Sequence, residues 1–431
     1  MVLKLPFVIL IVSFVSSCNQ INNPANGLIA LTGATIIDGN GGEPIVNGVI
    51  IFHDGRITAI GSKDETDLPK GTKIEDVSGK YIMPGIINGH GHVGETKGIE
   101  GGHYSRDNVI DNLAIYARYG VTTVVSLGGD KQDAEHLRFM NDSSATQHAR
   151  LFIAGEIVNG MTTDEVIAAV NRNHQMGVDF MKIRVDDNLG STDKMREDHY
   201  RSAINRSHAL GYKLAAHMYY LDDARKLLDA GADLLAHSIR DLPVDSTFVK
   251  LIKQKDAGYC ATLTRELSTF VYGDTAAFFT DPFFSREYSA STIKPLKDPK
   301  RQPEIKNASP AQTYRQQLPV AMSNLKKLSD AGVPIVFGTD SGVPTRFMGY
   351  FEHLEMQMMA DAGLTPMQII ASATRTAADQ LGLKGLGVLT VGNRADFLVL
   401  NKDPSINIRN TRTISAVFIG GEKVRSLKSE K

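Results

Sequence analysis

Eight short apolar runs alternate with helical patterns through the middle of this 431-residue chain, and this alternation restricts the fold more than any other feature. Helical spacing is visible at Val109, Leu113 and Ala117, which recur every four residues. Strands alternating with helices over about 300 residues predict a (β/α)8 TIM-like barrel. A doubly wound open sheet is the alternative, but no dinucleotide-binding glycine pattern follows the first strand. The expected strands are 86–88, 121–127, 151–154, 180–185, 214–217, 234–237, 259–263 and 335–338.

The two ends of the chain share a different pattern of short β-rich runs and turns. Asp54 and Gly55 stand between two such runs, which is a hairpin signal. We therefore expect residues 28–85 and 385–431 to form one small composite β-sandwich domain, with the barrel between them at 86–384. Residues 262–317 interrupt the alternation with many aromatic residues, so this stretch is either a lid insertion or an extra helical layer.

The N-terminus has the pattern of a targeting segment. Lys4 precedes an apolar run at 5–15, which is too short to span a membrane as a mature helix of about 20 residues. Val-Ser-Ser-Cys at 15–18 looks like a bacterial lipobox, so we expect a signal peptide at 1–17, lipidation of Cys18 and a tether at 18–27. An ordinary signal peptide with an incidental cysteine is the alternative. The lipobox places the protein outside the cytoplasm, held on the membrane only by lipid.

Charge and cysteine content exclude other classes of protein. The chain has 47 basic and 48 acidic side chains, a net charge of −1, which gives no electrostatic reason to expect a nucleic-acid partner. Two cysteines cannot form a disulfide framework. Cys260 lies in an apolar stretch and is expected in the core.

Four histidines fall at the carboxyl ends of expected strands, which is the active-site face of a barrel. They are His90, His92, His217 and His237. One strand-end histidine is more often structural, but four of them, with a His-x-His pair that points one way, predict a metal site. Asp340 ends the eighth strand and could bind metal and accept a proton, or simply cap the next turn.

Two further residues permit a functional and a structural interpretation. Lys182 shares the inward face of the fourth strand with Arg184; it could become an anionic carbamate that bridges two metals, or form an ion pair with an acid such as Asp186. Tyr219 follows His217 on the same face. Its hydroxyl could polarise a substrate carbonyl, or its ring could be part of the wall.

Taken together, the motifs resemble those of the metal-dependent amidohydrolase superfamily, nearest to its imidazolonepropionase-related and prolidase-like (Xaa-Pro, Xaa-Arg dipeptidase) branch. The segments that carry the resemblance are IMPGIINGHGH (82–92), YGVTTVVSLGG (119–129), GVDFMKIR (177–184), AAHMYY (215–220), AGADLLAH (230–237), FGTDSG (337–342) and GVLTVGNRADFLVLNKDP (387–404). Such a resemblance implies a barrel with a composite β-sandwich, metal-dependent hydrolysis and often a homo-oligomer.

Carried over residue by residue, the resemblance also implies roles. His90, His92, His217, His237 and Asp340 match metal ligands, Asp340 matches the proton shuttle, and Tyr219 matches the tyrosine of a His-x-Tyr motif. Lys182 matches a carboxylated lysine. Two positions depart from the pattern: Asn88 stands where Asp commonly precedes His-x-His, and VDDNLGS at 185–191 replaces a Ser-Gly-Gly-like loop.

The sequence thus predicts a hydrolase that cleaves an amide-type C–N bond of a small molecule, a dipeptide or an N-acyl amino acid. Two divalent ions, expected to be zinc, would hold a bridging hydroxide. For a substrate carboxylate the candidate cations are Arg184, Arg240 and Arg265. The alternatives are a hydrolase of cyclic amides of the imidazolone type, of lactones or of esters at the same site, and, from another class, a ligand-binding lipoprotein without catalysis.

Overall fold

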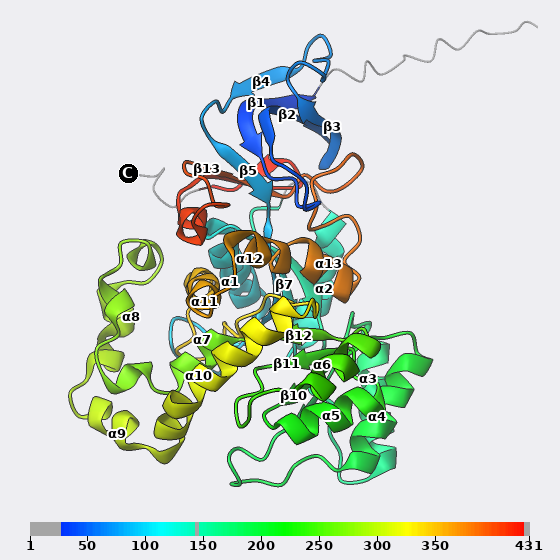
Figure 1. The fold of residues 1–431 in the computed structure, drawn as a ribbon, viewed down its shortest axis with the longest axis vertical. Helices are drawn as coiled ribbons and strands as arrows, with labels where there is room; N and C mark the ends of the chain where they lie inside the picture. Colours follow the sequence, from blue (N-terminus) through cyan, green and yellow to red (C-terminus); the bar gives the residue numbers. More distant parts are fainter. Residues whose placement is uncertain (1–26, 143–145, 426–431) are drawn as a thin grey trace, which may run out of the picture.

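The computed structural model describes residues 27–142 and 146–425 (Figure 1). The predicted signal peptide, Cys18 and most of the predicted tether lie outside the described residues. Within them, the chain builds a β domain from both of its ends and an α/β barrel from its middle. None of the described helices is long and apolar enough to cross a membrane.

The β domain is one eight-stranded sheet in which strands from the two ends of the chain pair directly. β13 (Phe397–Leu400) lies antiparallel to β5 (Tyr81–Pro84), so the late strands continue the early ones. Asp54 and Gly55, both with positive φ, turn the chain between two antiparallel strands, which confirms the predicted hairpin. The remaining strands are β1 (Ile29–Ile36), β2 (Ile45–His53), β3 (Arg56–Ser62), β4 (Lys73–Asp76), β14 (Ile414–Ile419) and β15 (Glu422–Lys423).

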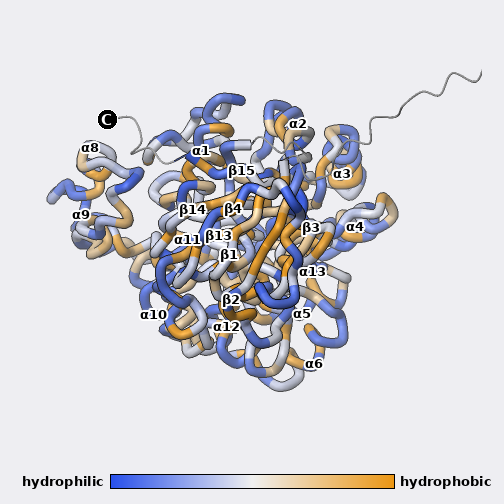
Figure 2. The backbone as a smooth tube through the Cα atoms, turned by 90° about the horizontal axis from the view of Figure 1, so that it is seen from above, coloured by the Kyte–Doolittle hydropathy of each residue, from blue (hydrophilic) through white to orange (hydrophobic). Residues whose placement is uncertain are grey.

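The sheet curls so that its two halves pack against each other. Phe52 of β2 lies 5.5 Å from Phe397 and 5.8 Å from Phe418 between ring centroids, although β2 is not a neighbour of β13 or β14 in the sheet. Burial of these rings provides the core of the β domain. Figure 2 looks onto this domain and shows hydrophobic residues concentrated along β2.

Eight parallel segments form the barrel. Seven are strands: β6 (Ile86–Gly91), β7 (Val121–Ser126), β8 (Arg150–Ile153), β9 (Met181–Val185), β10 (Leu214–Met218), β11 (Leu234–Ala236) and β12 (Gly258–Cys260). The eighth, residues 335–341, bridges β12 through Ile335 and β6 through Ser341. On the other side Val158, after β8, bridges Ile183 of β9, so the two sheets join into a ring. Seven of the eight predicted strands are confirmed in place, although the seventh ends at Cys260 and not at 263, and the predicted strand 335–338 is an extended segment held by isolated bridges. Cys260 is buried as expected.

Helices connect these strands and cover the outside of the barrel (Figure 1). α3 illustrates the local causes: Thr162 accepts the Glu165 backbone N–H at its start, and Gly177, with φ of 72°, ends it. The helices are α1 (Arg106–Arg118), α2 (Gln132–Arg138), α3 (Thr163–Met176), α4 (Glu197–Ala209), α5 (Leu221–Ala230), α6 (Ser246–Gln254), α11 (Tyr350–Asp361), α12 (Pro366–Ser372) and α13 (Arg375–Leu381).

The aromatic stretch that interrupts the alternation forms a helical arm at the side of the barrel. It contains α7 (Leu263–Ser268), α8 (Ala290–Ile293) and α9 (Arg301–Asn307), and α10 (Ser309–Asp330) leads back to the barrel. Figures 1 and 2 both show α8 and α9 at the periphery. Phe278, Phe284 and Tyr288 pack with Phe347 and Tyr350 in one buried aromatic cluster. This packing favours the interpretation as an added helical layer, and the lid stays an untested alternative.

Candidate metal centre

The four strand-end histidines lie together in the barrel. His90 belongs to β6 and His217 to β10, whereas His92 and His237 follow the ends of β6 and β11. Ring centroids are 4.6 Å apart for His90 and His237, 4.2 Å for His217 and His237, and 5.8 Å for His90 and His92. Three separate parts of the sequence thus contribute imidazoles to one cluster.

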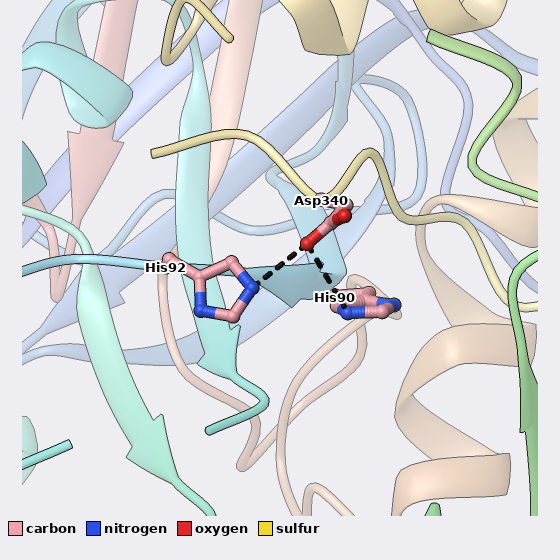
Figure 3. Close-up of side chains that lie close together, drawn as sticks. All are labelled: His90, His92 and Asp340. Carbon is pink, nitrogen blue, oxygen red and sulfur yellow. Dashed lines mark hydrogen bonds and ion pairs between the residues drawn. The ribbon is translucent and has the colours of Figure 1, made fainter. Parts of the chain in front are cut away.

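Lys182 and Asp340 complete this cluster. The Lys182 Nζ atom lies 3.4 Å from His90 Nε2. Asp340 Oδ1 lies 2.8 Å from His92 Nε2 and 3.5 Å from His90 Nε2, as Figure 3 shows. All six predicted ligands line one cavity of about 270 Å³. The structure brings them together, and metal binding by this full set stays a prediction.

The hydrogen-bond partners of His92 indicate that its site fits a cation. His92 Nδ1 is 3.0 Å from the Gly128 carbonyl, which can only accept, so Nδ1 carries the hydrogen. In that tautomer the lone pair of Nε2 faces the Asp340 carboxylate at 2.8 Å. Two acceptors this close repel each other unless a cation or a proton lies between them. The donor atoms of His90, His92 and Asp340 lie within 4.8 Å of one another, and this N/N/O set suits a divalent metal.

Neighbouring side chains also orient the other two histidines. His217 Nε2 donates to the buried Asp186 carboxylate at 2.8 Å, which leaves Nδ1 as its metal-binding nitrogen. His237 Nδ1 is 2.7 Å from the Thr262 hydroxyl, so Nε2 is available. Burial raises the pKa of Asp186, but the hydrogen bonds that it accepts from His217 and from the Asn188 backbone N–H, with the charge of Arg184, outweigh burial and hold the pKa well below the usual range. Asp186 pairs here with His217 and not, as the alternative interpretation had it, with Lys182.

Burial keeps the nitrogen ligands neutral. It lowers the pKa of His90 and His237 well below the usual value and that of His217 to about 3. Neutral imidazoles keep the lone pairs that metals need. Burial likewise lowers the pKa of Lys182 to about 8, which makes its neutral amine easier to reach than that of an exposed lysine.

Asp340 is held by a cation that sequence reasoning missed. Its backbone is left-handed, with φ of 58°, and its N–H donates to the His90 carbonyl at 2.7 Å. Arg346 Nη1 pairs with Asp340 Oδ2, and Arg346 Nε donates to the Ser268 hydroxyl at 3.1 Å. Burial raises the pKa of Asp340, but the charge of the Arg346 guanidinium outweighs burial and holds the pKa well below its usual range. No local pattern marks Arg346, because its role depends on the loop that follows the eighth segment.

Tyr219 and Arg240 are placed differently from the sequence expectation. Twelve described residues line the cavity, and neither Tyr219 nor Arg240 is among them. The Tyr219 hydroxyl donates to Gln317 of α10, and its ring lies over the Arg240 guanidinium at 4.3 Å. Arg240 is fully buried and pairs with Glu266 at 3.2 Å. A buried, paired arginine beneath Tyr219 does not present itself to a substrate in the cavity.

Arg184 and Arg265 do line the cavity, with different partners. Arg265 forms a 2.8 Å ion pair with Glu266. Arg184 is 40% exposed, donates to the Asn188 amide oxygen and lies 3.5 Å from Asp186. Because its ion pair is the longer one, Arg184 is the cation with more capacity for a new anion.

Comparison with known proteins shows the family of this chain. Residues 81–424 match the model of the amidohydrolase family. The chain belongs to the amidohydrolase family. The imidazolonepropionase of Paracoccus denitrificans is 25% identical to this amidohydrolase over 420 residues, covering 90% of this chain and 98% of the relative.

Solved structures share the fold of this amidohydrolase. A putative prolidase from Bifidobacterium longum has a TM-score of 0.75 at 24% identity, covering 93% of this chain and 95% of its own. A Xaa-Pro dipeptidase with methionine bound in its active site has a TM-score of 0.72 at 20% identity, and the match covers 92% of this chain and 99% of the dipeptidase. Family membership makes the protein a metal-dependent hydrolase that acts on C–N bonds, built as a TIM-like barrel with an added domain.

Proposed function

We propose that this amidohydrolase cleaves the amide bond of a dipeptide or an N-acyl amino acid with a two-metal centre, most simply two zinc ions. The observation that carries the proposal is the convergence of six donors, with Lys182 beside His90, on one small cavity. His90, His92 and Asp340 would hold one ion, and His217 and His237 the other. Lys182 would join the two after its neutral amine adds CO₂ to form a carbamate and releases a proton.

Bound divalent ions polarise a carbonyl and lower the pKa of water toward neutrality, which supplies the nucleophile at pH 7. Asp340 would take one proton from the attacking water and pass it to the leaving nitrogen. Overall, one water is consumed: its oxygen ends on the acyl carbon, and the amine gains a proton. Arg346 keeps Asp340 ionised and in place, as a proton acceptor requires.

Arg184 would bind the substrate carboxylate at the mouth of the cavity. Its guanidinium can hold a carboxylate bidentately, and its ion pair with Asp186, at 3.5 Å, is longer than that of Arg265. We assign no step to Tyr219, because its hydroxyl is engaged by Gln317. The likeness to a prolidase and to a dipeptidase that binds methionine supports an amino-acid substrate.

Cyclic amides are the second candidate, favoured by the similarity to imidazolonepropionases. A substrate panel separates the two: dipeptides and N-acyl amino acids in one set, imidazolone-type rings, lactones and esters in the other. Metal-loaded protein should hydrolyse the first set faster and contain about two zinc ions per chain. Activity confined to the second set, or active protein without metal, would overturn the proposal.

The Arg184 assignment needs a matched pair of substrates. Arg184→Met should lower kcat/KM by about 30- to 1000-fold (about 2–4 kcal/mol) for an acid whose carboxylate Arg184 binds, and far less for the matching C-terminal amide. Arg201→Met is the control, because Arg201 is similarly exposed, at 42%, on the outer surface of α4. Equal losses on the acid and the amide would show that Arg184 is not the anchor.

A further inference from the structure

A second, larger cavity adjoins the metal centre. It has a volume of about 840 Å³, against about 270 Å³ for the cavity of the six donors. Ile157 and Arg184 line both, so the two cavities are neighbours that meet at these side chains. The smaller volume suits the reacting amide, whereas the larger lies in the range of cavities that hold a whole small molecule.

The larger cavity lies between the segments that follow two neighbouring barrel strands. One wall comes from residues 157–161, after β8, and the other from residues 186–199, after β9. This is the face of the barrel where substrate-binding loops gather. The second wall includes the segment that departs from the dipeptidase pattern, so its shape is a property of this chain.

Apolar side chains are exposed at this cavity. Ile157 is 43% exposed and Met161 is 85% exposed, although both are large and hydrophobic. Met195 adds a second thioether to the lining. Flexible methionines fit their walls to apolar groups of varied shape. Exposed apolar side chains beside an active centre indicate an apolar ligand group.

The charges of the same cavity are largely neutralised within the protein. Lys194 pairs with Asp223 at 2.8 Å, and Arg196 pairs with Asp198 at 2.7 Å. Asp186 is bound by His217. Asp193 is exposed to solvent at the rim. An anionic ligand group would therefore have to compete with the partners of Lys194 and Arg196, whereas an apolar group would not.

We propose that this cavity receives a large apolar side chain on the amino acid that leaves with the amine. The inference rests on the proposed function and extends it, because it names which substrates are preferred. In such a substrate the scissile nitrogen is bonded to a carbon that carries both the carboxylate and the side chain. With the nitrogen in the small cavity and the carboxylate on Arg184, the side chain points to the larger cavity beyond Arg184.

A series of N-acetyl amino acids that differ only in side-chain length tests this directly. In each reaction water cleaves the same amide, giving acetate and the free amino acid. From alanine through norvaline and norleucine to 2-aminooctanoate, kcat/KM should rise by up to about fourfold for each methylene that leaves water. N-acetyl-aspartate and N-acetyl-lysine should be poorer substrates than N-acetyl-norleucine.

Met161→Asp examines the wall of the cavity itself. The ratio of kcat/KM for the 2-aminooctanoate substrate to that for the alanine substrate should fall at least tenfold, because a carboxylate replaces the apolar wall. Ile406→Asp is the matched control: Ile406 is 75% exposed and lies outside both cavities, so its ratio should equal that of the wild type. Calorimetry with free 2-aminooctanoate should show a negative heat-capacity change of binding in the wild type that is reduced in Met161→Asp.

The outcomes separate this inference from the proposed function. If metal-loaded enzyme hydrolyses none of the N-acetyl amino acids or dipeptides, the proposed function fails and the inference fails with it. If it hydrolyses them with no dependence on side-chain length, or if Met161→Asp lowers both rates equally, only the inference is overturned.

Discussion

Asn88 binds three parts of the centre through hydrogen bonds that suit an amide. Its Nδ2 donates to Glu352 Oε1 at 2.6 Å and to the Thr339 hydroxyl at 3.0 Å, while its Oδ1 accepts the His90 backbone N–H at 3.0 Å. Glu352 is fully buried and also accepts from Thr339 and Ser341. An aspartate at this position would face the Glu352 carboxylate without a proton to share. An amide at position 88, where the family pattern commonly has Asp, is therefore explained by Glu352 of α11, which accepts its hydrogen bond.

Asn88→Asp should destabilise the fold by about 3 kcal/mol at neutral pH, because two buried carboxylates would meet. Burial already raises the pKa of Glu352, and a second carboxylate should raise it further. The folded variant then binds a proton that the unfolded chain releases above about pH 4.3, so its stability should fall as pH rises. Chemical denaturation at pH 5 and pH 8 measures this slope.

The control for this prediction is a double-mutant cycle. Combining Asn88→Asp with Glu352→Gln restores one amide and one carboxylate in contact, so the double variant should recover stability relative to Asn88→Asp and lose its extra pH dependence. Additive losses in the cycle, or a variant as stable at pH 8 as at pH 5, would show that the contact does not act in this way.

Single residues were predictable where they stand at the end of a strand. The four histidines and Asp340 stand at or just beyond the ends of apolar runs, and parallel strands in a barrel end on the same face, so their convergence follows from the local pattern. Lys182 lies within β9, and only the family resemblance indicated its role. Arg346 and Glu352 had no such signal. Their contacts depend on how a loop and α11 pack over the barrel, which involves segments far apart in sequence. For the same reason the buried position of Arg240 could not be predicted.

At the scale of elements, the alternation of strands and helices could be predicted from the sequence, because strands and helices repeat their apolar residues with different periods. The arm around α8 and α9 could not be predicted in this way, because its aromatic residues recur with neither the helix nor the strand period. The structure shows how the arm is fixed: Glu287 binds Arg118 of α1 through two 2.7 Å hydrogen bonds. Both side chains are largely shielded from solvent, with 6% and 16% of their surfaces exposed.

Glu287→Gln should release the arm from α1, because it leaves a shielded guanidinium without its carboxylate. The expected loss is about 3 kcal/mol of unfolding free energy, with faster proteolysis at the lysines and arginines of residues 294–301. If the arm is a structural layer, kcat/KM should change less than twofold. Glu197→Gln, which breaks an exposed pair with Arg201, is the control and should change neither. A large fall in kcat/KM at unchanged stability would instead indicate a lid.

At the scale of the whole molecule, the β domain and the barrel are joined by a buried ion pair. Arg150 of β8 binds Asp396, next to β13, through hydrogen bonds of 2.6 and 2.9 Å. Asp396 also accepts the Gly420 backbone N–H at 2.6 Å. This contact between the two parts was not visible in the sequence, although the pairing of the chain ends was, because both ends share the same short β-rich runs.

Location is a property of the whole chain and depends on Cys18. We propose that the mature protein begins there, carries lipid and lies outside the cytoplasm. Cys18→Ala should block processing or release the protein from membranes, as measured by fractionation and intact mass. Cys260→Ala is the control and should remain membrane-bound, because Cys260 is a buried core residue. A wild-type product that starts at Met1 and stays in the cytoplasm would contradict this prediction.

Metal should also stabilise the barrel as a unit. The six donors come from β6, β9, β10, β11 and their flanking residues, together with the eighth segment, so bound ions would tie opposite sides of the ring together. A ligand at 100 times its dissociation constant stabilises the folded state by about 2.7 kcal/mol, so chelation should lower the thermal midpoint. Lys182→Met, which cannot form the carbamate, should show a smaller chelator effect, whereas Lys213→Met on the surface should match the wild type. If chelation strips the metal, verified by elemental analysis, and leaves the midpoint unchanged, the ions do not hold the barrel together.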